Sequence, residues 1–243
     1  MVSLSALLVP RGNLDAPGAA EGWFHDIAMH VLGSCRLRVA ASICRLVEIE
    51  FYFDSKDHPD PFAHRDPVQA HCGRWYFHRI GRSYRGGSFK GFDLTFGSDG
   101  AHGGILIRSL ETPDGRLVVG PSLCVDYLLA TTGSSSVAAL ADAIGDRHAT
   151  DPGSPLQLVD GSPVEVTLFR SARVGLSLKR HSDAIAVDRL ARPYRFLTEP
   201  RRVTKGRPEL IAALLSAGHS PDDVRRLTGS PIKVIRAFSG LES

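Results

Sequence analysis

The sequence is short of the features that mark several large classes of protein. It has four cysteines in 243 residues, none of them in a CxxC pair, so neither a zinc ribbon nor a disulfide framework is indicated, and we expect a reducing, cytoplasmic location. No run of apolar residues approaches the roughly 18 that a membrane span needs. The G-x-S-x-G elbow of many serine hydrolases is missing as well.

Neither sign of charge predominates, because the formal net charge is only +3. Its distribution is uneven, however. Residues 74–90 hold five Lys/Arg and no acid, and residues 189–207 hold seven Lys/Arg against one acid, Glu199. Such runs are commonly solvated faces, but two of them in one chain favour a polyanionic partner.

The stretch VEIEFYF, residues 47–53, alternates apolar and polar side chains. Alternation predicts a strand with Val47 and the following apolar residues on one face and Glu48, Glu50 and Tyr52 on the other. The simpler interpretation is a half-buried strand with a solvated outer face. The alternative is a strand whose polar face lines a cavity, with Glu50 as acid or base and Tyr52 as a stacking surface.

The other segments predict an α+β fold. A helix is expected over 22–32, and strands are expected over 35–40, 43–53, 74–80, 163–169 and 193–197 and in the stretches FDLTFG and GGILIRSLE. Because these strands do not alternate regularly with helices, we predict a curved, mainly antiparallel sheet with flanking helices.

The chain changes character towards its end. Residues 1–21 are expected to be a loose leader, residues 22–204 the main domain, and residues 205–243 a small helical tail. Pro208, Ser220 and Pro231 can open three short helices in the tail. The tail resembles a helix-turn-helix with Lys233 and Arg236 on the would-be recognition helix, although a packed three-helix appendage is the simpler interpretation.

Several stretches of the main domain follow one another in a familiar order. They are HDIAMHVLGSCRLRV, RLVEIEFYF, FAH, GRWYFH, GILIRSLE, GPSLC, SARVGLS and ARPYRFL. In this order, over roughly residues 25–198, they resemble the alkyladenine (3-methyladenine) DNA glycosylase family. Each piece alone is weak, but eight in sequence are hard to obtain by chance.

The resemblance implies a fold of that glycosylase type, a monomer and an enzyme that removes damaged purines from DNA without metal or cofactor. It makes Glu50 the catalytic residue that activates water, and it places a flipped-out base in a pocket. The residues that it implies for base binding are Tyr52, His64, His78 and Arg108.

The basic insert over residues 81–91 departs from the family pattern. Lys90 falls where the family has a tyrosine that wedges into the duplex, and Tyr84 is the candidate to replace it. Gly97 falls near the place of an asparagine that helps to select the base. The residues expected to contact nucleic acid are Tyr84, Arg82, Arg85, Lys90, Arg202 and Lys205.

These departures leave other functions open. A Gly-rich basic insert can also cradle phosphate, which would suit an N-glycosidase acting on a nucleotide or another N-riboside. A third alternative is a non-catalytic protein that binds DNA or a nucleobase. His58, His64, His71 and Cys72 could in principle hold a metal, but their spacing matches no ligand pattern, and we predict none.

Overall fold

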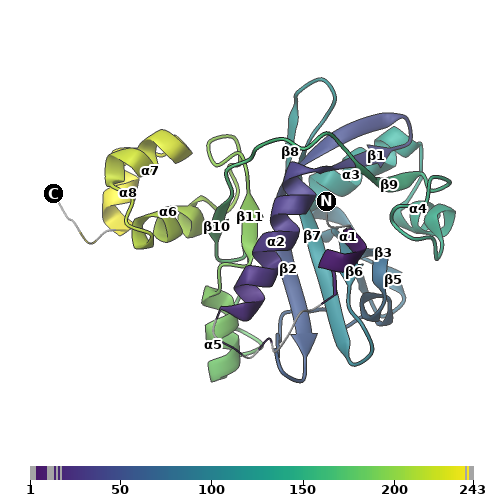
Figure 1. Ribbon diagram of the computed structural model, residues 1–243, viewed down its shortest axis with the longest axis horizontal. Coiled ribbons are helices and arrows are strands. Elements are labelled where there is room, and N and C mark those ends of the chain that lie inside the picture. The colour runs from purple at the N-terminus through teal and green to yellow at the C-terminus, as the bar shows by residue number, and fades with distance from the viewer. Residues whose placement is uncertain (1–3, 10–13, 15, 17, 239, 241–243) are drawn as a thin grey trace.

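The computed structural model describes residues 4–9, 14, 16, 18–238 and 240, and it shows a mixed α+β fold built on one large sheet (Figure 1). The sheet runs in the order β10-β11-β2-β7-β6-β3, with β1 and β9 joined to one end of β2 and with β8 on β7. Every pairing between these strands is antiparallel. The strands are β1 Cys35–Val39, β2 Ser42–Ser55, β3 Cys72–Phe77, β6 Phe92–Phe96, β7 Ala101–Glu111, β8 Leu117–Val119, β9 Leu156–Asp160, β10 Phe169–Ser171 and β11 Arg195–Leu197.

A small hairpin and the helices complete the architecture. The hairpin is β4 Arg79–Ile80 and β5 Ser83–Tyr84, and two short 3₁₀ helices, η1 Pro67–Ala70 and η2 Gly87–Phe89, lie in loops. The helices are α1 Leu4–Leu7, α2 Ala19–Gly33, α3 Pro121–Thr132, α4 Val137–Ile144, α5 Ala184–Ala191, α6 Arg207–Ser216, α7 Pro221–Thr228 and α8 Ile232–Phe238. No helix in the described part of the chain is long and apolar enough to cross a membrane alone; α3 and α4 reach that measure only as a pair bent by 68°.

The main core lies between the sheet and α2, which crosses the sheet in Figure 1. Phe24 of α2 stacks on Phe51 of β2 with ring centroids 4.6 Å apart. Trp23 meets Phe53 edge to face at 5.2 Å. The alternating apolar residues of β2 thus bind α2, as the sequence pattern predicts for one face of the strand.

The alternation in β2 is broken at Val47. The pairing of β2 with β7 shifts register between Leu46 and Ile49, as in a β-bulge. As a result Leu46 and Ile49 both face the main core, whereas Val47 is buried in a second cluster. The prediction that Val47 shares a face with Ile49 was therefore wrong, because an inserted residue reverses the orientation of the side chains that follow it.

The second cluster joins the helical tail to the main domain. Val47 of β2 and Leu197 of β11 are buried in it together with residues of all three tail helices: Leu210, Ile211, Leu214, Val224 and Ile235. The three-helix packing expected for the tail is confirmed. The caps also lie where the sequence puts them, since the Ser220 hydroxyl accepts a hydrogen bond from Asp223 N and Gly229 ends α7 at φ 70°.

Four details differ from the sequence-based expectations. The strand predicted over 163–169 was wrong, because β10 includes only Phe169 of that range. β9 and α5 were not predicted. The leader, of which residues 1–3, 10–13, 15 and 17 lie outside the described residues, contains α1 and the first residues of α2, and Trp23 Nε1 donates to Leu7 O at 2.7 Å.

The second cluster makes the tail part of the folded unit, and this can be tested with Leu210→Ala. Leu210 is fully buried, so we expect a loss of about 2–5 kcal/mol in the free energy of unfolding of the whole chain in one transition. Chemical denaturation followed by fluorescence measures it. Leu123→Ala, at a leucine that is 50% exposed, is the control and should cost little. A separate early transition for the tail would contradict this packing.

Candidate active site

Glu50 is a fully buried carboxylate that three donors hold in place. Its Oε1 accepts a hydrogen bond of 2.7 Å from the backbone N–H of Val174. Its Oε2 accepts one of 2.9 Å from the Tyr52 hydroxyl and one of 3.3 Å from Arg108 Nη1. The solvated outer face of VEIEFYF is therefore contradicted, since both of its glutamates are buried.

Tyr52 stands between this carboxylate and a small pocket of about 120 Å³. Burial and then the negative charge of Glu50 raise the pKa of Tyr52 well above its ordinary value, so its hydroxyl keeps the proton that it donates. The side chains around the pocket come from separate segments of the chain: Tyr52, Phe62, His64, Gln69, His78, Asp93 and Leu176. Three of the four residues predicted to bind a base thus share one pocket.

The two pocket histidines touch each other edge to face, with ring centroids 4.3 Å apart. His64 Nδ1 lies 3.1 Å from the Tyr76 hydroxyl, and His78 Nε2 donates to Asp93 Oδ1 at 2.8 Å. The surrounding protein and then His78 lower the pKa of His64 to about 4, so this ring is neutral near pH 7. The pocket therefore offers the neutral ring of His64 and the ring of His78, which is bound to the buried carboxylate of Asp93.

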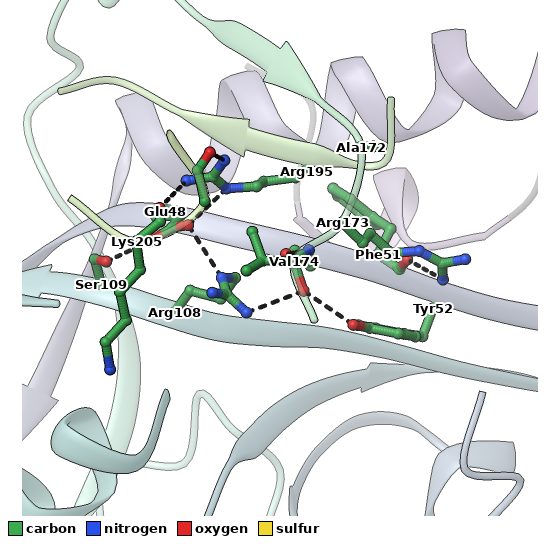
Figure 2. Close-up of polar contacts among 12 residues, drawn as sticks. Glu48, Phe51, Tyr52, Arg108, Ser109, Ala172, Arg173, Val174, Arg195 and Lys205 are labelled. Atoms are coloured by element: carbon green, nitrogen blue, oxygen red, sulfur yellow. Dashed lines mark hydrogen bonds and ion pairs between the residues drawn. The ribbon is translucent and has the colours of Figure 1, made fainter. Parts of the chain in front are cut away.

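Behind Tyr52 the buried charges form a network of two glutamates and two arginines, Glu48, Glu50, Arg108 and Arg195 (Figure 2). Arg108 bridges both carboxylates, and its Nε donates to Glu48 Oε1 at 3.0 Å. Arg195 Nε donates to the same oxygen at 2.7 Å, and Ser109 donates to Glu48 Oε2. The formal charges cancel, which meets the main condition for keeping charges out of water.

The network also fixes the protonation of its members. Burial alone would raise the pKa of Glu48, but Arg195 and Arg108 outweigh it and hold the pKa below its usual value. Burial likewise opposes the charge on Arg108, and Glu50 and Glu48 overcome it and raise its pKa. Glu48, for which the resemblance implied no role, is therefore an ionised structural partner of the site.

Arg173 has a place in the site that the sequence did not reveal. Its guanidinium carbon lies 4.5 Å from the centre of the Tyr52 ring. Its Nη1 and Nη2 donate to the two oxygens of Asp60, at 2.6 and 3.2 Å, and both residues are buried. Within the stretch ARVG, Arg173 thus packs on Tyr52 and the Val174 N–H binds Glu50. The stretch itself was among the matched motifs, so only its role was missing.

Arg195 connects the network to the start of the tail. It donates to Lys205 O and Gly206 O, both at 2.8 Å. Gly206 has φ 72°, and a Cβ there would lie 2.3 Å from the Val174 side chain and 2.7 Å from Arg195 Nη1. Only glycine fits between these two residues, so the chain entering α6 lies directly against the site.

The basic insert adjoins the pocket through the backbone of His78. His78 N donates to Gly91 O and Arg85 N to His78 O, both at 2.9 Å, which ties the middle and the last residue of the insert to the pocket wall. Lys90 forms an ion pair with Asp126 of α3. Arg82 is exposed, and Tyr84 is only half exposed because it packs against the main core.

Two of the predicted nucleic-acid contacts, Arg202 and Lys205, lie in the segment between β11 and α6. Arg202 pairs with Glu111 and donates to Gly115 O at 2.8 Å. Lys205 is exposed, and in Figure 2 its side chain points away from Glu48 and Arg195. Arg202 is thus engaged within the protein, while Lys205 is an exposed residue whose Nζ lies beside Gly120.

The histidines and the cysteine weighed as metal ligands are not brought together around the pocket. Both ring nitrogens of His58 are hydrogen-bonded, Nδ1 with Phe53 O at 2.9 Å and Nε2 with the Tyr194 hydroxyl at 2.8 Å. Among the described residues, the group of potential ligands that does converge is His30, Cys35 and Asp160, outside this pocket. All four cysteines are free, and Cys72 is the exposed one among them.

Comparison with known proteins adds one relative and no family, since no family model matches the chain. An alignment over 124 residues that covers 45% of the chain is 38% identical to the uncharacterized protein L759 of Acanthamoeba polyphaga mimivirus. The chain spans 57% of the length of that protein.

The role assigned to Glu48 predicts how stability depends on pH. Its pKa is lowered in the folded state, so its stabilising contribution is present above the unfolded pKa near 4.5 and is lost as pH falls below that value. Glu48→Gln should cost about 3 kcal/mol at pH 7, because Arg108 and Arg195 lose a buried anionic partner.

The free energy of unfolding of the same variant should differ less from that of wild type at pH 3.5 than at pH 7. Urea unfolding at a series of pH values measures both. Asp99→Asn, at an exposed carboxylate between β6 and β7, is the control and should follow wild type. An equal loss at both pH values would contradict an ionised Glu48.

Proposed function

We propose that the protein is a monofunctional N-glycosylase of the alkyladenine DNA glycosylase type, which removes damaged purines from DNA. The observation that carries the proposal is the convergence of Tyr52, His64 and His78 on one pocket with Glu50 hydrogen-bonded behind Tyr52. These residues come from three distant stretches that resemble the family in sequence. A fold unrelated to base binding would have no reason to bring them together.

The chemistry suits a carboxylate at this place. The bond from sugar C1′ to the base nitrogen breaks, and its electron pair leaves with the base, which takes up a proton. The sugar passes through a cation-like state that the negative charge of Glu50 stabilises. Glu50 also takes a proton from the water whose oxygen bonds to C1′. Arg108 and Val174 N–H keep the carboxylate in position throughout.

The size of the pocket favours a base over a larger ligand. At about 120 Å³ it is well below the 300–1,000 Å³ of sites that enclose drug-sized molecules. One ring system would enter, while sugar and phosphate remain outside. Because Arg173 covers one face of Tyr52, a base stacked on this ring would use the opposite face.

Basic residues along β2 are consistent with a duplex lying on this side of the protein. Arg202 pairs with Glu111, which is the register partner of Arg45. From Arg45 to Tyr52 a strand extends about 23 Å, the length of roughly seven base pairs. A duplex along β2 would therefore reach from Arg45 to the pocket.

One observation favours the second candidate, an N-glycosidase acting on a nucleotide. Tyr84 packs against the core instead of standing free as a wedge residue must, and Lys90 is held by Asp126. A substrate without a duplex needs no wedge. The aromatic side chain of the insert that is most accessible is Phe89, which is 70% exposed.

The central test of the proposal is Glu50→Gln. This change removes the base and the negative charge, so we expect turnover on lesion-containing oligonucleotides to fall by about two orders of magnitude or more. Released bases are measured by mass spectrometry, at a temperature where circular dichroism shows the variant folded.

Glu111→Gln is the matched control, because Glu111, like Glu50, is a glutamate held by arginine, in its case by Arg45 and Arg202. It should retain activity near that of wild type. If Glu50→Gln keeps wild-type turnover, or if the two variants lose it equally, Glu50 has no catalytic role.

The wedge can be assigned with a pair of alanine variants. We expect Phe89→Ala to impair action on duplex far more than on single strands or mononucleotides, because only a duplex leaves a gap to fill. Tyr84→Ala should affect all three substrates alike, through packing. A duplex-specific loss in Tyr84→Ala instead would assign the wedge to Tyr84, and no substrate dependence in either variant would favour the nucleotide enzyme.

A further inference from the structure

A group of three metal-ligand side chains converges away from the base pocket. His30 lies in the last turn of α2, Cys35 is the first residue of β1, and Asp160 is the last residue of β9. Cys35 and Asp160 face each other in the antiparallel register of β1 and β9. One ligand atom from each of the three side chains lies within 4.8 Å of the other two.

None of these side chains is satisfied by the protein around it. His30 Nε2 is buried and has no hydrogen-bond partner. Within the described residues, Cys35 Sγ forms no hydrogen bond although the residue is only 1% exposed, and the Asp160 carboxylate forms neither an ion pair nor a hydrogen bond. A buried nitrogen without a partner costs about 1–3 kcal/mol, so His30 Nε2, which lies beside a buried thiol and an exposed carboxylate, calls for an explanation.

We propose that His30, Cys35 and Asp160 bind a divalent transition metal of the zinc class. A thiolate, an imidazole and a carboxylate together suit Zn²⁺ or Co²⁺, whereas Mg²⁺ and Ca²⁺ require oxygen ligands. One thiolate and one carboxylate would also neutralise the charge of the ion.

The geometry is close to what such an ion needs. In a tetrahedral site with bonds of about 2.0–2.3 Å, ligand atoms lie roughly 3.3–3.8 Å apart. A contraction of about 1 Å from the observed limit of 4.8 Å is therefore sufficient. Asp160 is exposed and can supply this movement, and solvent on its side can provide the fourth ligand.

Cysteine binds a metal as the thiolate, so binding would release the proton of the Cys35 thiol. The ion would lie between Cys35 and Asp160, which face each other across β1 and β9. The metal would join the end of α2 to β1 and β9, and the proposal is independent of the glycosylase reaction.

Titration of chelator-treated, full-length protein with Co²⁺ tests this site. We expect one equivalent to bind, with the absorption band of thiolate-to-cobalt charge transfer, and Zn²⁺ to displace it. One equivalent of Zn²⁺ should also raise the melting temperature, because the ion binds only the folded chain. Absence of stoichiometric binding would overturn the proposal.

Variants assign the ligands. Cys35→Ser should remove the charge-transfer band, and Asp160→Asn should weaken binding at least tenfold; the latter alters an exposed side chain, so it tests the site even if Cys35→Ser fails to fold. Cys72→Ser, at the exposed cysteine, is the matched control and should bind as wild type does. A band that survives Cys35→Ser, or one that Cys72→Ser abolishes, would contradict the assignment.

Discussion

Two carboxylates on one strand, Glu48 and Glu50, are buried in the folded chain, and the arrangement of the sheet depends on neutralising them. An isolated buried carboxylate would cost so much that it would take up a proton instead. Arg108 from β7 and Arg195 from β11 supply the opposite charges from the two strands that flank β2. The three strands are thereby fixed to one another at the level of the candidate site.

The same network connects the site to parts of the chain that are distant in sequence. Through Arg195 it holds the backbone at Gly206, where the helical tail begins. Through Glu50 it holds Val174, and next to it Arg173 supports Tyr52. A change in the tail entry or in the ARVG stretch would therefore shift the carboxylate that we assign to catalysis. Positioning of this kind is the usual way in which a catalytic group is kept within reach of its substrate.

Features that depend on neighbouring residues could be predicted from the sequence. Alternation was enough to predict β2, helical spacing predicted α2, and serine, proline and glycine signals predicted the three helices of the tail. Glu50, Tyr52, His64 and His78 were found through motifs, and the structure places them in one region, three of them lining the pocket and Glu50 behind Tyr52.

Features that depend on distant partners were not predictable in this way. The residues of VEIEFYF do not predict the bulge that turns Val47 to the second cluster. They also do not predict that two arginines from other strands allow Glu48 to be buried. The strand β9 forms by pairing with β1, which is distant in sequence. The buried Asp60 is stabilised by an ion pair with Arg173, which is also distant in sequence. In each case a long-range contact decides the environment, and a single sequence does not record which contacts form.

The central claim is that Glu50 and its pocket hydrolyse an N-glycosidic bond. It is tested most directly by incubating the wild-type protein with a panel of lesion-containing oligonucleotides and free nucleotides in ¹⁸O-labelled water. Mass spectrometry then follows both products. The account predicts release of one free base, with a single ¹⁸O in the sugar product and none in the base. Failure to release a base from any substrate, or appearance of the label in the base, would contradict it.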